Sequence, residues 1–386
     1  MPEADRTIEI TRIEGFACRV PVEVPVATSF GVMRNRPAVF VRVEDADGTF
    51  GWGEAFANWP AAGAEHRVNL LADDVADLVL GRTFVSPPAM FDSLSAETRV
   101  RALQCGEFGP FRQVIAALDI AAWDLVARRL GVPLAKALSH DAGMSIPSYA
   151  SGIHIDAAPS EIERARSAGF SAFKVKVGFE ASTEPAKLAE LAAGLAEEER
   201  LFADANQAWD CAAALDFMDA AGGVGLGWIE EPIIADAPPA DWQALAGGPV
   251  PLAGGENIAG RDGFDAALAL GALSFFQPDV AKWGGISGCH AVAQDVLSNG
   301  KVYCPHFLGG GIGLVASAHV LAATGGPGLL EVDVNPNPLR DAFALPVIHN
   351  GGWSIPSRPG LGIDDLPGEV RAAVTHRRVL NSQIRT

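Results

Sequence analysis

From about Pro147 onward, short apolar runs typical of buried strands alternate with stretches rich in alanine and leucine that are typical of helices. Eight such apolar runs are present: SYASGIHI, AFKVKVG, RLFADAN, GWIEEP, VPLAGGE, SFFQPDV, VYCPHF and GLLEVDV. The stretches between them, such as EPAKLAELAAGLAEEE, are long enough to form crossover helices. Eight strands that alternate with helices predict an α/β fold built on a TIM-type (β/α) barrel.

Residues 1–130 do not follow this alternation. The segments IEITRIEGFACRVPV and AVFVRVEDADGTFGWGEA alternate like strands, and Asp47-Gly48 is typical of a hairpin turn. Helical patterns follow over roughly 63–80 and in FRQVIAALDIAAWDLVARRLG. We predict an α+β N-terminal domain over 1–130, the barrel over 131–335, and a C-terminal segment over 336–386 that returns to the N-terminal domain.

The charge balance excludes some classes of partner. Lys and Arg number 29 against 47 Asp and Glu, a formal charge of −18, which disfavours nucleic acid and anionic membranes. No apolar run approaches the roughly 20 residues needed to span a bilayer, and MPEADRTIEI lacks the pattern of a signal peptide. The five cysteines contain no CxxC pair, which indicates reduced thiols. We expect a cytoplasmic protein.

Three carboxylates, Asp204, Glu230 and Glu256, lie at the ends of the third, fourth and fifth predicted strands and are separated by 26 residues each time. Carboxylates at one edge of a parallel sheet repel each other unless a cation lies between them, and their oxygens suit Mg²⁺. Taken singly, each is also typical of a helix cap or a turn. Their position at three successive strand ends favours a metal site.

The other strand ends are also rich in titratable groups. These are Lys174 and Lys176 on the second strand, Asp279 and Lys282 at the sixth, His306 at the seventh and Glu331 at the eighth. Each has a structural alternative, such as a lysine at a strand rim or a buried histidine with satisfied hydrogen bonds. Because catalytic groups of a barrel lie at the carboxyl ends of its strands, the whole set favours one shared site.

This set of groups suits the removal of a proton next to a carboxylate. A divalent cation that binds the substrate carboxylate stabilises the enediolate formed by loss of the α-proton. Lys176 would act from one face and His306 from the other, because their strands lie on opposite sides of the three carboxylates. We expect Lys174 and a nearby cation to lower the pKa of Lys176. Asp279 would hold the second ring nitrogen of His306, and Glu331 would hydrogen bond to the substrate if it stays protonated.

At these residues the chain resembles the enolase superfamily, and within it the mandelate racemase branch of the mandelate racemase and muconate lactonizing enzyme family. FKVKVG resembles the KxK motif of that family, DAN, IEEP and GGEN resemble its three ligand motifs, and QPDVAKWGG and CPHF resemble its Asp and His motifs. The resemblance covers nearly the whole chain. It implies a modified barrel with an N-terminal capping domain.

The resemblance implies a role for each matching residue. Mg²⁺ would be held by Asp204, Glu230 and Glu256, and Lys176 would be one base. Further roles follow in the same way: Lys174 at the substrate carboxylate, the Asp279–His306 dyad as second base or acid, Glu331 at the substrate, and Asn206 and Lys282 as substrate-binding residues near the metal. Muconate lactonizing enzymes usually have Asp as third ligand and a second Lys on strand six. Glu256 and the dyad favour the other branch, although Lys282 leaves that second lysine role open.

Two loops of the capping domain select the substrate in this family. By analogy they are residues 27–36 (ATSFGVMRNR) and 54–61 (EAFANWPA). Arg34 and Arg36 would meet hydroxyls or a distal carboxylate. Apolar side chains would close the pocket: Phe30, Met33, Phe56 and Trp59.

We therefore expect an enzyme that acts on a small-molecule carboxylate with Mg²⁺ as cofactor, and dehydration of a sugar acid is the first hypothesis. The alternatives are a racemase or epimerase, a cycloisomerase, and a barrel that binds an acid without turning it over. The resemblance also implies a homo-oligomer, either a dimer or an octamer.

Overall fold

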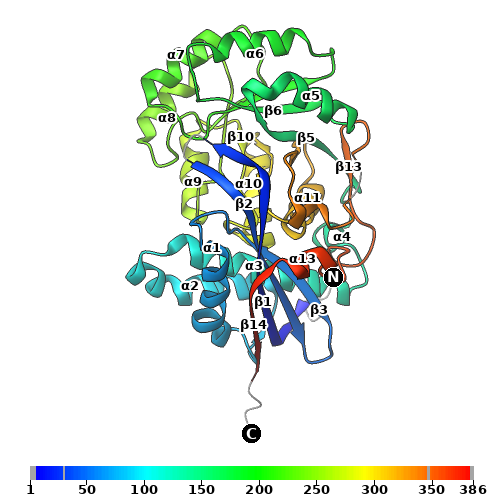
Figure 1. Cartoon of the computed structure of the whole chain (residues 1–386). Helices are drawn as coiled ribbons and strands as arrows, with labels where there is room; N and C mark the ends of the chain where they lie inside the picture. Colours follow the sequence, from blue (N-terminus) through cyan, green and yellow to red (C-terminus); the bar gives the residue numbers. More distant parts are fainter. Residues whose placement is uncertain (1–5, 29–30, 346–347, 383–386) are drawn as a thin grey trace.

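The structure, a computed structural model, describes residues 6–28, 31–345 and 348–382. An antiparallel sheet with three helices lies at one end of the molecule, and a parallel barrel with its surrounding helices lies at the other (Figure 1). The predicted fold class is confirmed, because a parallel sheet of eight strands is joined to a separate antiparallel N-terminal sheet.

The capping sheet has the order β14-β1-β2-β3, and the short strand β4 pairs with the start of β1. Its strands are β1 (Ile8–Thr28), β2 (Gly31–Asp45), β3 (Phe50–Ala55), β4 (Thr83–Phe84) and β14 (Val374–Asn381). The hairpin predicted at Asp47-Gly48 is confirmed, and Gly48 has the positive φ of +83° that such a turn requires. The long β1–β2 hairpin extends from this sheet toward the barrel (Figure 1).

Three helices cover one face of the capping sheet: α1 (Gly63–Leu70), α2 (Pro87–Cys105) and α3 (Phe108–Arg129). The predicted helical segment 63–80 begins as α1 and continues through a π-helical turn (Leu71–Val75) and a 3₁₀ turn (Ala76–Leu78). The helix α3 is apolar on nearly all sides because β3 packs on one side of it and the barrel on the other. A Cβ atom at Gly51 or Gly53 would lie 2.0 Å from a carbonyl oxygen of α3, so this packing requires glycine.

All eight predicted barrel strands are confirmed, and they lie parallel in the order β11-β10-β9-β8-β7-β6-β5-β12. Their bounds are β5 (Ser145–His154), β6 (Ala172–Lys176), β7 (Arg200–Asp204), β8 (Ile229–Glu230), β9 (Leu252–Gly254), β10 (Phe275–Phe276), β11 (Val302–Tyr303) and β12 (Leu330–Asp333). Within the described ranges no strand ladder joins β11 to β12. There a Cβ on Gly328 would lie 1.8 Å from the carbonyl oxygen of Tyr303, so the backbones meet directly.

The helices between these strands are α4 (Leu134–Leu138), α5 (Ala158–Ser167), α6 (Glu184–Ala193), α7 (Cys211–Ala221), α8 (Pro239–Ala246), α9 (Arg261–Leu270), α10 (Gly285–Ser298) and α11 (Gly311–Thr324). Of these, α10 contacts α3 and α11 contacts β3, so these two helices carry much of the contact with the capping domain. Inside the barrel, the rings of Phe202 and Trp228 stack with centroids 3.6 Å apart. This apolar floor leaves only the carboxyl ends of the strands for polar groups.

After β12 the chain forms α12 (Pro338–Asp341), β13 (Gly352–Ser354) and α13 (Gly368–Ala372). The strand β13 pairs with β5 of the barrel, and β14 then pairs with β1 of the capping sheet. All five cysteines are free thiols. In the described ranges, no helix combines the length and the apolar character needed to cross a bilayer.

Candidate active site

The three predicted metal ligands lie at one edge of the barrel. Asp204 and Glu230 are the last residues of β7 and β8 and are register partners, while Glu256 follows β9 by two residues. Asp204 and Glu230 are buried, and the side chain of Glu256 is only 12% exposed. Burial and then the charge of Asp204 raise the pKa of Glu230 to about 7, against the opposing effect of Lys174. The carboxylates are therefore close enough to repel each other.

The two lysines of β6 reach into this cluster. Lys174 Nζ, which is 1% exposed, lies 2.7 Å from Glu230 Oε1, 2.8 Å from Glu331 Oε1 and 3.5 Å from Asp204 Oδ2. Lys176 Nζ lies 2.7 Å from Asp204 Oδ2 and 2.6 Å from Asn206 Oδ1. The structure thus brings Lys174, Lys176 and Asn206 together with the predicted ligands.

These contacts set the pKa of Lys176 in this arrangement. Burial and the neighbouring Lys174 lower the pKa of Lys176, but the carboxylates of Asp204 and Glu230 outweigh them, so the pKa of Lys176 is raised. Asp204 Oδ2 lies 2.7 Å from the ammonium group. The predicted lowering depends on a cation beside Lys176, and for the protein with Mg²⁺ bound it stays a prediction.

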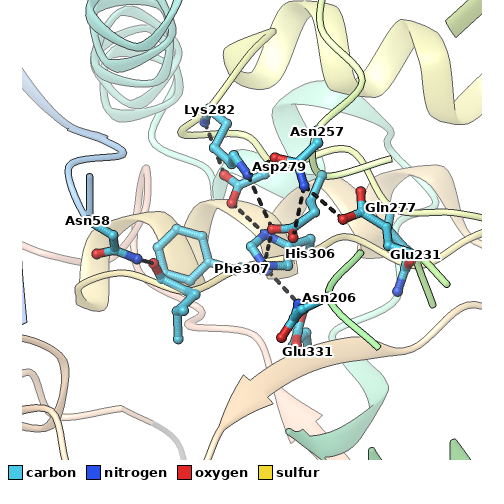
Figure 2. Close-up of polar contacts among 12 residues, drawn as sticks. Asn58, Asn206, Glu231, Asn257, Gln277, Asp279, Lys282, His306, Phe307 and Glu331 are labelled. Carbon is cyan, nitrogen blue, oxygen red and sulfur yellow. Dashed lines mark hydrogen bonds and ion pairs between the residues drawn. The ribbon is translucent and has the colours of Figure 1, made fainter. Parts of the chain in front are cut away.

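The Asp279–His306 dyad is formed, with His306 Nδ1 2.7 Å from Asp279 Oδ2 (Figure 2). The other oxygen of Asp279 accepts hydrogen bonds from the amides of Ala281, at 2.7 Å, and Lys282, at 3.1 Å. On its far side His306 Nε2 lies 2.8 Å from Glu256 Oε2. Burial lowers the pKa of His306, but Glu256 and Glu331 outweigh it and raise the pKa well above its usual value.

Glu331, at β12, joins the lysines to the histidine side of the site. One of its oxygens contacts Lys174, and the other accepts a hydrogen bond of 3.2 Å from the amide of Phe307. Burial raises the pKa of Glu331, but the charges of Lys174 and His306 outweigh burial, and the pKa is lowered. The condition that Glu331 stays protonated is therefore not met in this arrangement, because two cationic groups face it.

Lys282 contacts the carboxylate of Glu256, which His306 also contacts. Its Nζ is 3.2 Å from Glu256 Oε2 and 2.9 Å from Asn257 Oδ1. It also lies over the ring of Phe56 in the capping domain, 4.8 Å from the ring centroid. Lys282 therefore links the barrel site to a capping loop.

The capping loops are only partly in the described ranges, and Phe30 lies outside them. Trp59 is 38% exposed and packs over Gly31, where a Cβ would lie 2.9 Å from the indole ring. The two loops therefore touch each other. Arg34 is exposed on β2, and among the described residues it makes no hydrogen bond or ion pair with a strand-end group. Met33 is buried.

Arg36 links the capping domain to the barrel through a buried ion pair, and its contact with substrate stays a prediction. It is 2% exposed, and its guanidinium lies 2.8 Å from Asp333 Oδ2 at the end of β12. Arg340 lies 3.4 Å from the same oxygen. The pair joins the β1–β2 hairpin to the barrel and leaves the Arg36 guanidinium buried away from solvent.

We expect Arg36→Met to lower the free energy of unfolding by about 3 kcal/mol, because it leaves Asp333 buried with a more distant partner. Urea unfolding followed by circular dichroism measures this loss. The matched control is Arg34→Met, which should change the stability by less than about 0.5 kcal/mol because Arg34 is exposed. Equal effects of the two substitutions would contradict the assignment.

Three residues of the site were missed from the sequence. Gln277 donates a hydrogen bond of 2.5 Å to Glu230. Asn257 donates one of 2.7 Å to Glu231 (Figure 2). All three lie in the motifs QPDV, GGEN and IEEP, so the signal was present, but only one residue was assigned within each of these motifs. Glu231 also has a φ of +38°, and Asn206 has +45°. Such strained backbone in non-glycine residues is concentrated at functional sites.

The donor set fits a hard divalent cation, because it offers carboxylate oxygens from three adjacent strand ends. In the parts of the chain that the structure describes, no three such groups converge on one point. Their oxygens are turned toward cationic neighbours instead: Lys174, Lys176, Lys282 and His306. The arrangement places proton-transfer groups on two sides of a carboxylate cluster.

Fold and site together define a barrel enzyme with acid–base groups at the carboxyl ends of its strands. The chain belongs to the mandelate racemase and muconate lactonizing enzyme family of the enolase superfamily. The family model described as "Enolase C-terminal domain-like" matches residues 157–365, and that of the "Mandelate racemase / muconate lactonizing enzyme, N-terminal domain" matches residues 11–139. The resemblance seen in the motifs is confirmed.

Known proteins support this membership over nearly the whole chain. D-galactarolactone cycloisomerase of Agrobacterium fabrum is 29% identical and covers 92% of this chain and 96% of its own. A mandelate racemase/muconate lactonizing enzyme of Bordetella bronchiseptica is 45% identical, with a TM-score of 0.89 and coverage of 95% and 99%. L-talarate dehydratase of a Polaromonas species, solved with Mg and L-glucarate, is 25% identical, with a TM-score of 0.83 and coverage of 97% and 100%. The chain is an enzyme of the lyase or isomerase type.

Proposed function

We propose that this protein is an Mg²⁺-dependent dehydratase of a sugar acid that removes the proton α to the substrate carboxylate. One observation carries the proposal: Lys176 and the Asp279–His306 dyad lie on opposite sides of the strands that bear Asp204, Glu230 and Glu256. The related L-talarate dehydratase, solved with Mg and L-glucarate, supports both the metal and the substrate class.

Asp204, Glu230 and Glu256 would hold the metal ion. When bound, Mg²⁺ supplies positive charge that stabilises the enediolate form of the substrate carboxylate. Two neighbours orient Glu230: Gln277 donates to one of its oxygens, and Lys174 contacts both. Asn206 would position Lys176 through the hydrogen bond between its side-chain oxygen and the lysine.

Proton transfer would use both faces of the α-carbon. With Asp204 engaged as a metal ligand, its carboxylate would no longer hold Lys176 as an ammonium group, and the neutral amine of Lys176 would take the α-proton from the β6 side. His306 then donates a proton from its ring to the β-hydroxyl as the C–O bond breaks, and water leaves. Asp279 accepts a hydrogen bond from the Nδ1–H group of His306 and so fixes which nitrogen faces the substrate. Glu331 anchors Lys174 and the amide of Phe307.

The remaining assignments follow from position. Lys282, Arg34 and Trp59 would contact the distal part of the substrate, because they lie on or near the capping loops. We further propose domain limits of 1–130, 131–335 and 336–386, a cytoplasmic location and a homo-oligomer, either dimer or octamer.

The second candidate is cycloisomerisation, and the 29% identical D-galactarolactone cycloisomerase favours it. The same α-proton abstraction serves cycloisomerisation and epimerisation, because the reactions diverge only after the enediolate forms. What differs is whether His306 protonates a leaving oxygen or the α-carbon. The product therefore separates the reactions.

A panel of sugar acids and their lactones, incubated with enzyme and Mg²⁺ in D₂O, tests the proposal. A 2-keto-3-deoxy acid as product indicates dehydration, and a ring-opened lactone product indicates cycloisomerisation. Deuterium at the α-carbon with inverted configuration indicates epimerisation. If acids of the panel bind but show neither turnover nor α-deuterium, the protein is an acid-binding barrel and the proposed function is wrong.

A further inference from the structure

The capping domain holds both turns that carry the dyad. We call residues 279–287 the Asp279 turn and residues 306–313 the His306 turn. The amide of Phe56 donates a hydrogen bond of 3.0 Å to the Ala281 carbonyl in the Asp279 turn. Asn58 Nδ2 donates one of 2.9 Å to the Leu308 carbonyl in the His306 turn (Figure 2). The segment that follows β3 therefore contacts both.

Glu54, in β3, is a buried carboxylate aimed at the His306 turn. It is 1% exposed and accepts hydrogen bonds from the amides of Gly310 and Gly313, the latter at 2.8 Å. These amides form the first turn of α11. A Cβ atom at Gly309 would lie 2.7 Å from Glu54 Oε1, and one at Gly310 would lie 3.0 Å from it. The glycine-rich turn LGGGIG thus leaves room for this carboxylate.

Asp119, in α3, has the same relation to the Asp279 turn. It is fully buried, and it accepts hydrogen bonds from the Ser287 amide at 2.8 Å and the Ser287 hydroxyl at 2.6 Å. These groups lie in the first turn of α10. A Cβ atom at Gly285 would lie 2.4 Å from Asp119 Oδ2. The first turns of α10 and α11, the helices that follow the dyad residues, therefore each donate hydrogen bonds to a carboxylate of the capping domain.

Neither helix has a cap of its own. The N-cap residues are Gly284 for α10 and Gly310 for α11, and neither makes a side-chain cap hydrogen bond. The first amides of a helix need acceptors and favour negative charge. Glu54 and Asp119 supply both the acceptors and the negative charge, and both residues belong to the capping domain. Their burial is costly, since it raises the pKa of each to about 7 against their hydrogen bonds to the helix amides.

We propose that Glu54 and Asp119 are positioning residues that fix the turns carrying His306 and Asp279. The dyad is then assembled only when the capping domain is docked on the barrel. The catalytic part of this inference rests on the proposed function. Burying a carboxylate at each of the two dyad turns is costly. This cost favours a role in positioning the dyad over a role in stability alone.

Hydrogen exchange measured by mass spectrometry on the full chain with Mg²⁺ tests the structural part. In Glu54→Gln the charge and one acceptor are lost, so the amides of 306–313 should exchange about tenfold faster. The matched control is Asp124→Asn. Asp124 is equally buried in α3, but it accepts from the amides of Trp52 and Leu361 and pairs with Arg128, and none of these three residues lies in either dyad turn. It should leave exchange at 306–313 unchanged.

Steady-state kinetics tests the catalytic part on the acid that the wild type turns over. Glu54→Gln should lower kcat about tenfold with KM nearly unchanged. Asp124→Asn should retain the wild-type kcat per folded molecule, and Glu54→Asp, which keeps the charge, should recover part of the loss. If Glu54→Gln does not fold, Glu54→Asp must still show raised exchange at 306–313 and a lowered kcat.

Equal exchange at 306–313 in Glu54→Gln and Asp124→Asn would overturn the inference, and so would a wild-type kcat in folded Glu54→Gln. A wild type that turns over no acid of the panel would refute the proposed function instead, while the exchange data would still decide the positioning role. The two failures are therefore distinguishable.

The raised pKa of Glu54 predicts that the stability of the fold depends on pH. Its pKa in the folded state, about 7, lies above the ordinary 4.5, chiefly because of burial and also because of the nearby Asp279. Cys18 of β1 faces it as well. The folded wild type binds the extra proton, so this part of its stability is full below pH 4.5 and is lost as the pH rises to about 7. Relative to Glu54→Gln, the folding constant should fall on the order of a hundredfold over that range. A constant ratio in denaturant titrations across it would contradict the assignment.

Discussion

Turnover by the Lys176→Met variant is expected to fall by about 10³-fold, within the range that general acid–base groups contribute. Lys176 is the ammonium group at the end of β6 that contacts both Asp204 and Asn206, and Lys174 is held by two other carboxylates. Lys174 therefore cannot replace Lys176 as the base without leaving its carboxylate partners. The measurement is kcat on the acid identified in the substrate panel, with KM expected to change little.

A second experiment substitutes His306, the group on the opposite face of the substrate α-carbon. In His306→Asn, Lys176 remains, so α-deuterium exchange in D₂O should persist for substrates whose proton points to the β6 side, while dehydration is lost. In Lys176→Met both the α-deuterium exchange of those substrates and their dehydration should be lost. Lys187→Met is the control, since Lys187 is an exposed lysine paired with Asp156. A kcat of Lys176→Met within tenfold of the wild type would show that Lys176 is not the base.

Binding of Mg²⁺ by Asp204→Asn is expected to weaken by at least about 100-fold, because even residues that only orient a ligand cost 10–100-fold. Titration calorimetry with Mg²⁺ alone measures this without any substrate. The variant also loses the carboxylate that faces Lys176, so both lysines of β6 lose a counter-charge. Turnover should fall below detection together with metal binding.

Asp216→Asn provides the matched control, because Asp216 is exposed on α7 and the substitution is identical. Its Mg²⁺ isotherm should overlay that of the wild type. Circular dichroism on both variants separates loss of metal from loss of fold. If Asp204→Asn bound Mg²⁺ as tightly as the wild type while folded, Asp204 would not be a ligand, and the proposed metal site would be wrong.

The barrel was predictable because its strands are buried on both faces and therefore read as short continuous apolar runs. The strand ends were also predictable, because polar residues end each apolar run where the strand meets solvent. This placed Asp204, Glu230, Lys176 and His306 at one edge before any contact was known. The helix 63–80 was predicted in extent, but its change to a π-helical turn after Leu70 has no comparable signal.

Contacts between distant parts of the chain were not predictable. Arg36 pairs with Asp333, 297 residues away, and Glu54 accepts from Gly310, 256 residues away. An arginine in a loop has the same local pattern whether it meets a substrate or a buried carboxylate. Only the docking of the capping domain on the barrel decides between them.

By itself the sequence determined the strand order, the edge at which the polar groups gather and the class of chemistry, because strand periodicity places alternate residues on known faces. The tertiary structure alone decided the direction in which the pKa values of those groups shift. A pKa depends on burial and on the distance to every neighbouring charge, so the proximity of Asp204 raises the pKa of Lys176, and Lys174 with His306 lowers the pKa of Glu331.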